Sequence, residues 1–182
     1  MTTLALLAIA LLAVVCGLIL FRAIPAAKTY FSFRGKRLVT CPETLAKEAV
    51  DVAAKEAAAW AFVGQFDLRL SQCSRWPERR DCGQECLQQI ESDPVNCLVW
   101  NIVSNWYEGQ RCVYCHKSFG SLQHFDPAPA LMGPDRKTVE WNHFRPEQLP
   151  ELFSTYKPVC WGCHVTETLR QEHPELVVYR KR

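Results

Sequence analysis

The chain contains two Cys-x-x-Cys-His motifs, Cys112-Val113-Tyr114-Cys115-His116 and Cys160-Trp161-Gly162-Cys163-His164. Between Cys115 and Cys160 lie 44 residues. These motifs suit two different chemistries. Four cysteines in two close pairs can close a tetrahedral zinc site. Each motif can instead attach a haem covalently, with its histidine as the iron ligand.

The zinc interpretation uses only the cysteines. In a Cys-x-x-Cys turn, backbone N–H groups point at the sulfurs and favour the thiolate, so two sulfurs can bind one ion at about 2.3 Å. Two such turns make a closed structural site, which predicts Zn²⁺ held by Cys112, Cys115, Cys160 and Cys163. A helix is expected from Cys163 to about residue 172, as in the second knuckle of a treble clef or zinc ribbon. His116 and His164 would then lie beside the site without binding the ion.

The haem interpretation uses the histidines as well. A repeated Cys-x-x-Cys-His resembles the attachment motif of c-type cytochromes, and this resemblance implies a dihaem electron-transfer protein. It would carry two haem c groups, with His116 and His164 as proximal ligands. Attachment of haem c takes place outside the cytoplasmic membrane, so this alternative predicts a periplasmic domain. Distal ligands would come from His124, His143, His173 or Met132.

The composition predicts one globular domain of modest size that contains bound metal, haem or disulfides. The chain has 182 residues, of which 48% are hydrophobic, and a formal net charge of +2. This near-neutral charge gives no reason to expect nucleic-acid binding. Ten cysteines are too many for incidental use in a core, while eleven prolines and six tryptophans suit a small, loop-rich α+β fold.

The N-terminus predicts a single membrane-spanning helix. Residues 4–21 carry no charge, which is long enough to span a bilayer, and the span can extend to residue 27. A cleaved signal peptide is the alternative, but only three uncharged residues precede the apolar run. We therefore expect a transmembrane helix over 1–27, a basic juxtamembrane linker over 28–38 and a Cys-rich domain over 39–182.

Basic residues follow the span and predict its orientation. There is no acidic residue after the span until Glu43, and the basic residues before it are Arg22, Lys28, Arg34, Lys36 and Arg37. The positive-inside rule therefore predicts a single-pass protein of the cell membrane with a cytoplasmic C-terminal domain. We expect this basic flank to contact anionic lipid headgroups.

A second cysteine set consists of Cys41, Cys73, Cys82 and Cys86, with Cys97 to spare. A helix expected from Cys82 to about residue 91 would present Cys82 and Cys86 on one face, and the four together would suit a second tetrahedral site. The alternative is that several of them pack as buried thiols. Before them, residues 45–63 show a helical apolar stripe, whereas Val50-Asp51-Val52 alternates and suits a hairpin over 42–52 followed by a shorter helix.

Two wider resemblances bear on function. Four stretches resemble uncharacterised bacterial membrane-anchored Cys-rich proteins with zinc-ribbon or treble-clef-like elements: Cys73-Ser-Arg-Trp-Pro, Asp81-Cys82-Gly-Gln-Glu-Cys86, Cys112-Val-Tyr-Cys115 and Pro158-Val-Cys160-Trp-Gly-Cys163-His. This resemblance spans most of residues 36–178 and implies one family and one domain, without an assigned activity.

The second resemblance is local. Asn142-His143-Phe144-Arg145-Pro146 resembles the histidine stretch of HNH nucleases, which also place it between Cys-x-x-Cys pairs. Trp141 and Asn142 stand where an acid or histidine is usual, so a nuclease of this kind would be degenerate. We expect no catalytic residue here.

Together these features predict a membrane-anchored zinc-binding module with a structural or protein-interaction role. An exposed tryptophan such as Trp76, Trp100 or Trp161 would offer contact to a protein partner.

Overall fold

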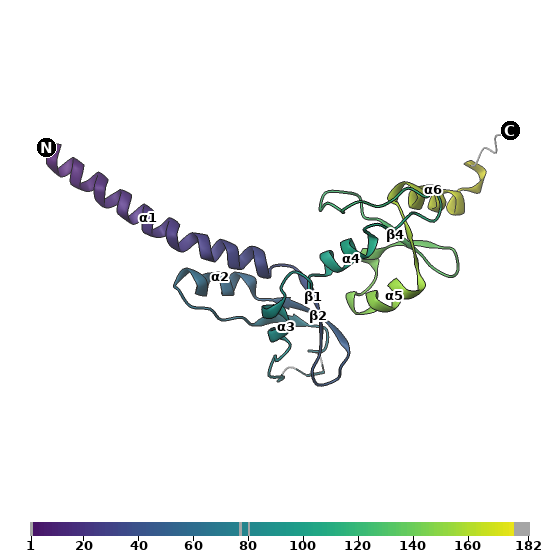
Figure 1. Ribbon diagram of the computed structural model, residues 1–182, viewed down its shortest axis with the longest axis horizontal. Coiled ribbons are helices and arrows are strands. Elements are labelled where there is room, and N and C mark those ends of the chain that lie inside the picture. The colour runs from purple at the N-terminus through teal and green to yellow at the C-terminus, as the bar shows by residue number, and fades with distance from the viewer. Residues whose placement is uncertain (1, 77, 80, 177–182) are drawn as a thin grey trace. The chain divides into compact units, whose positions relative to one another are not determined.

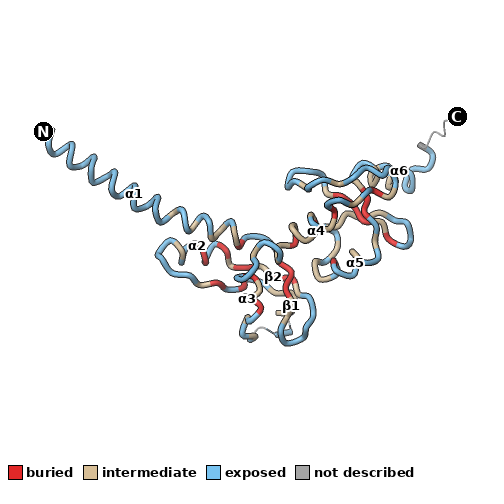
Figure 2. The backbone as a smooth tube through the Cα atoms, viewed as in Figure 1, coloured by how far each residue is buried: buried red, intermediate tan, exposed pale blue. Residues whose placement is uncertain are grey.

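The computed structural model describes residues 2–76, 78–79 and 81–176. The chain divides into two compact units, Met1–Leu98 and Val99–Arg182. This division falls inside the range 39–182 that the sequence suggested as one domain. It arises because each unit buries its own hydrophobic cluster, drawn red in Figure 2. The expected combination of an apolar N-terminal helix with a small α+β, Cys-rich region is confirmed.

The first unit consists of a long helix and a three-stranded antiparallel sheet of order β1-β2-β3 (Figure 1). Its elements are α1 (Thr2–Phe33), β1 (Lys36–Thr40), β2 (Lys47–Val52), α2 (Ala54–Phe62), β3 (Leu70–Cys73) and α3 (Leu87–Ser92). Strand β2 buries Ala49, Val50 and Val52. Thus the hairpin alternative is confirmed, and a continuous helix over 45–63 is wrong.

Helix α1 is long and apolar enough to cross a membrane, and its apolar N-terminal part is exposed (Figure 2). The helix does not end at residue 27 but continues to Phe33. Its later turns pack against α2, where Arg22 Nη1 donates to the Phe62 carbonyl at 3.4 Å. The chain leaves the helix at Gly35, whose φ of +92° is a conformation that glycine adopts without strain. Residues 28–33 are therefore helical rather than an extended linker.

Arg37 fastens the end of α1 to the sheet. Its side chain is only 1% exposed and donates to the Ser32 carbonyl in α1 and to the Pro94 carbonyl. The guanidinium carbon also lies 5.9 Å from the centre of the Phe33 ring. Burial lowers the pKa of Arg37. The cation expected on the lipid-facing flank is thus an internal clamp on the last turn of α1.

Replacing Arg37 by methionine should destabilise the first unit by about 2–4 kcal/mol, because two half-buried carbonyls lose their charged donor. Lys36→Met is the matched control. Lys36 is half-exposed and its ammonium lies 3.9 Å from Asp51, so the control should cost less than about 1 kcal/mol. Thermal denaturation of the full chain in detergent measures both variants. Equal melting temperatures for the two would contradict the clamp.

The second unit is built on a small antiparallel sheet of order β5-β4-β6 (Figure 1). Its helices and strands are α4 (Val99–Tyr107), β4 (Ala130–Met132), β5 (Thr138–Glu140), α5 (Leu149–Thr155), β6 (Lys157–Val159) and α6 (Trp161–Glu172). Short 3₁₀ turns occupy η1 (Trp141–His143), η2 (Pro146–Gln148) and η3 (Pro174–Leu176). Tyr107 is fully buried and its hydroxyl donates to the Ala130 carbonyl at 2.8 Å, which joins α4 to β4. Long connections leave the two Cys-x-x-Cys-His motifs on a turn after α4 and at the start of α6.

Candidate metal centre

Four cysteines of the second unit are positioned to hold a metal ion. The ligand atoms of Cys112, Cys115, Cys160 and Cys163 all lie within 4.8 Å of one another. Cys112 and Cys115 belong to the turn after α4, whereas Cys160 follows β6 and Cys163 lies in the first turn of α6. The Val113 N–H of the first motif donates to the Pro158 carbonyl of β6 at 3.1 Å, which joins the two motifs across the 44 residues that separate them.

The sulfur spacing fits one tetrahedral ion. Sulfurs about 2.3 Å from a central ion lie about 3.8 Å apart along the edges of a tetrahedron. Cys115 Sγ and Cys160 Sγ are 3.7 Å apart. The Cys160 N–H donates to Cys112 Sγ at 3.4 Å, so the second motif also stabilises a sulfur of the first.

Backbone donors favour a thiolate at Cys112. Burial raises the pKa of this thiol, but N–H groups of Cys115, Cys160 and Tyr114 lower it, and the net result is a pKa of about 7. The pKa values of Cys160 and Cys163 are raised, first by burial, and neighbouring cysteines of the cluster raise them further. Four thiolates this close repel one another, so a bound cation is needed for all four to ionise together.

The first motif forms a tight turn. The Cys112 N–H donates to the Lys117 carbonyl at 3.0 Å, and the His116 N–H donates back to the Cys112 carbonyl at 2.9 Å. Outside this pair, Arg111 and Ser118 form an antiparallel bridge. His116 closes the turn with a φ of +60°, a left-handed conformation, and its side chain is exposed. The residue after this Cys-x-x-Cys pair is therefore constrained by its backbone rather than by its imidazole.

The second motif starts a helix instead. The His164 N–H donates to the Cys160 carbonyl at 2.9 Å, as a helical turn requires. The His164 imidazole Nδ1 lies 2.8 Å from Thr138 Oγ1, which links α6 to β5. The two histidines thus have different backbone conformations and different surroundings, although their sequence motifs are alike.

The other histidines are placed outside the cluster. His124 stacks on Trp100 with ring centres 4.4 Å apart, and His173 Nδ1 lies 3.1 Å from Glu175 Oε1. His143 is exposed in η1, next to the half-buried Trp141. Within the described part of the chain, the ligand group contains none of these histidines. The expectation that this stretch holds no catalytic residue stays a prediction.

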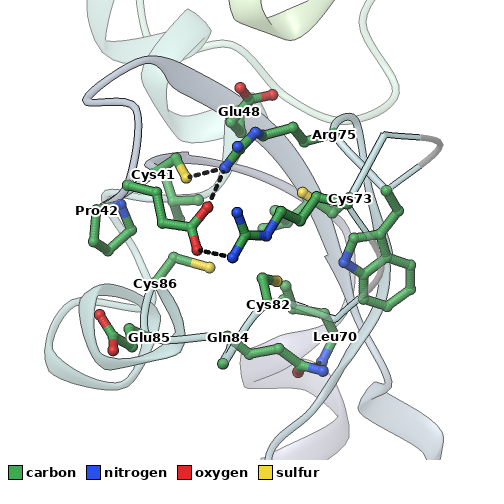
Figure 3. A pocket seen from close by; sticks show the side chains of 16 residues that line it. Cys41, Pro42, Glu48, Leu70, Cys73, Arg75, Cys82, Gln84, Glu85 and Cys86 are labelled. Carbon is green, nitrogen blue, oxygen red and sulfur yellow. Dashed lines mark hydrogen bonds and ion pairs between the residues drawn. The ribbon is translucent and has the colours of Figure 1, made fainter.

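The second cysteine set lies in the first unit. Cys41, Cys73, Cys82 and Cys86 all line one cavity (Figure 3), and Cys97 does not. The expected helix from Cys82 is wrong, because Gln84 has a left-handed φ of +55° and α3 begins only at Leu87. Burial raises the pKa of the Cys86 thiol to about 11, and the nearby thiols of Cys73, Cys82 and Cys41 add to this shift.

Comparison of the chain with protein-family models, with curated proteins and with solved structures gives no match. The function must therefore be argued from the sites themselves.

The left-handed backbone at His116 gives a direct test of its role. His116→Gly should keep the bound metal and leave the melting temperature unchanged or higher, because glycine adopts this conformation freely. His116→Val should lower the stability by about 1–2 kcal/mol, since a β-branched residue is strained there. Metal content and thermal denaturation of the full chain measure both. If His116→Gly abolished binding of the metal, the imidazole would be a ligand.

Proposed function

We propose that the second unit is a zinc-stabilised module with a structural or protein-interaction role, held at the membrane by α1. The observation that carries this proposal is the convergence of four cysteine sulfurs within 4.8 Å of one another. A closed set of four thiolates has no open position for a substrate, which is typical of structural rather than catalytic zinc.

The sulfur positions favour one shared ion over two haem groups. Each haem c needs its own pair of thioether bonds beside a separate porphyrin. Here all four sulfurs of the two motifs lie within 4.8 Å of one another, which is the spacing of ligands around one shared ion. In addition, the two histidines that haem would require as matching ligands occupy unlike backbone conformations.

Zinc would supply folding free energy that the second unit needs. The hydrophobic cluster around the site has only three buried members, Cys112, Ala130 and Val159, and the partly buried Phe119 and Met132 pack against it. Binding of structural zinc contributes about 10–16 kcal/mol in small zinc-finger peptides. This exceeds the stability of many whole domains of this size.

The membrane part of the proposal rests on α1 and its flank. The helix is apolar over its exposed N-terminal part, Arg22 and Lys28 follow in its later turns, and Arg34 comes directly after its end. We infer a single-pass protein whose two units lie in the cytoplasm, with these cations at the lipid headgroups. Arg37 adds nothing to that contact because it is buried.

A protein partner would meet apolar side chains near the metal ligands. Trp161 directly follows the ligand Cys160 and is 47% exposed, and Phe125 of the same unit is fully exposed. Trp76 packs against the core of the first unit and Trp100 stacks on His124, so these two are less available. Trp161 is therefore the tryptophan best placed for an interaction role.

Removing one ligand should release the ion. Cys163→Ser should lose one zinc per chain and lower the melting temperature of the second unit, because three thiolates no longer close the site. Cys16→Ser, in the exposed apolar part of α1, is the matched control and should keep the metal. Elemental analysis and calorimetry of the full chain in detergent measure both effects.

The same preparations separate zinc from haem. Protein purified from membranes should be colourless and should lose its metal to a strong chelator. Sharp visible bands that survive denaturation, together with a mass increase at Cys112 or Cys160, would show covalent haem and end the zinc proposal.

Orientation has its own test. A C-terminal epitope tag should be protected from protease in intact bacterial spheroplasts and digested after lysis. Replacing Arg22, Lys28 and Arg34 by glutamine should make a fraction of the chains accessible in intact spheroplasts, since these charges set the orientation. Digestion of the unsubstituted protein before lysis would place the units on the outer side.

A further inference from the structure

We propose that Cys41, Cys73, Cys82 and Cys86 form a second metal centre, in the first unit, whose ligands are four thiolates and whose occupant is zinc or iron. This centre goes beyond the function proposed above, since it involves a different unit and different residues.

The first argument is a repeated turn. The Cys41 N–H donates to the Ala46 carbonyl at 2.8 Å, and the Leu45 N–H donates back to the Cys41 carbonyl at 2.8 Å. Leu45 closes the turn with a φ of +60°. Thr40 and Lys47 pair outside it as the last register position of the β1–β2 hairpin.

Every one of these features matches the first motif of the other unit. There the donors and acceptors join Cys112 with Lys117 and with His116, at the same sequence offsets of five and four residues. The φ of His116 is also +60°, and the flanking bridge joins Arg111 with Ser118 at the same offset of seven. Cys41 therefore sits in the backbone turn that presents a ligand sulfur in the candidate centre.

The donors to the sulfurs agree as well. Cys41 Sγ accepts backbone N–H bonds from Glu43 and Thr44, two and three residues later. Cys112 Sγ accepts from Tyr114 and Cys115 at the same two offsets. Thr44 stands three residues after Cys41, where Cys115 stands after Cys112. The turn at Cys41 therefore supplies one sulfur instead of two, and the other ligands must come from other segments.

Three other cysteines reach the same place from separate segments. Cys73 ends β3, Cys82 lies in the connection that follows, and Cys86 directly precedes α3. All of them line, with Cys41, a cavity of about 80 Å³. Figure 3 shows the four side chains around this cavity.

Polar contacts hold these segments in place beside one another. Gln89 of α3 accepts from the Thr40 N–H at 3.0 Å and donates to the Thr40 carbonyl at 2.6 Å. Gln84 accepts from the Leu70 N–H at 2.9 Å, which fixes the segment between Cys82 and Cys86 against β3. The cysteines thus converge through contacts that do not involve their own sulfurs.

One cation lies against a sulfur of the set. Four thiolates around one divalent ion carry a net charge of about −2, and Arg75 Nη1 donates to Cys41 Sγ at 3.3 Å. Glu43 lies 2.8 Å from Arg75 and 3.4 Å from Arg79, which holds Arg75 beside that sulfur. The lining as a whole carries charges of both signs, because the carboxylates of Glu43, Glu48 and Glu85 lie there with Arg75 and Arg79.

The second set is less tightly grouped than the first. Among the described residues, the group of side chains close enough to share one ion is that of Cys112, Cys115, Cys160 and Cys163, whose ligand atoms lie within 4.8 Å of one another. Binding of one ion would draw the four sulfurs of the second set inward, whereas a [4Fe–4S] cluster, in which each cysteine binds a different iron atom, fits wider spacing. The shared feature of both occupants is ligation by four thiolates.

Metal content of the full chain in detergent tests the second centre. The protein produced with zinc and iron available should bind metal at both centres. The double variant C41S/C86S should lose the metal of the first unit and keep that of the second. Cys97→Ser is the matched control, because Cys97 lies in the same unit outside the cavity, with its sulfur 3.7 Å from the Gln89 carbonyl. It should keep both. Cys163→Ser should lose only the centre of the second unit, so the two proposals can fail separately.

A second measurement covers the case in which C41S/C86S does not fold. Unsubstituted protein is treated with iodoacetamide before and after chelation, and mass spectrometry locates the alkylated cysteines. Cys41, Cys73, Cys82 and Cys86 should be protected until the metal is removed, at least tenfold in rate.

The colour of the protein and its content of zinc, iron and sulfide identify what the four cysteines bind. Colourless protein with an additional zinc per chain indicates a single ion, and brown protein with iron and inorganic sulfide indicates a cluster. Metal at the second unit alone, equal alkylation with and without chelator, or disulfides among these four cysteines would each overturn the proposal.

Discussion

Mutual repulsion between four closely spaced thiolates is the constraint on which the second unit depends. Their sulfurs lie within 4.8 Å of one another, beside a small buried cluster of Cys112, Ala130 and Val159. Without a cation, at least some of the sulfurs must keep their protons, as the raised pKa values of Cys160 and Cys163 indicate. A shared ion replaces this repulsion by attraction and joins the turn after α4 to the start of α6.

The candidate site was predictable from sequence because its ligands occur in local pairs. A Cys-x-x-Cys spacing brings two sulfurs together within one turn, so only the meeting of the two turns required the fold. The roles of the two histidines could not be read from the motifs, because the same sequence pattern is folded in two different ways. A histidine follows each Cys-x-x-Cys pair, yet His116 is a left-handed turn residue, whereas His164 is helical and hydrogen-bonded to Thr138.

The turn at Cys41 was not predictable in this way. Its backbone hydrogen bonds repeat those at Cys112, but Thr44 stands where a second cysteine would have revealed it. The sequence Thr40-Cys41-Pro42-Glu43 suits the start of a helix, and the alanine-rich residues that follow favour one. Pairing of Val50 with both Arg37 and Cys73 prevails over that local preference, because it buries Val50 and Val52 in the core. The position of α3 also depends on tertiary contacts, those of Gln89 with Thr40.

The continuity of α1 into the first unit has a mechanical consequence. Phe33, the last residue of the helix, is buried in the core, and Arg37 grips the carbonyl of Ser32 beside it. Only Arg34 and Gly35 therefore lie between α1 and β1. If α1 spans a membrane, as we propose, a change in its tilt or rotation would be transmitted directly to the sheet of the first unit.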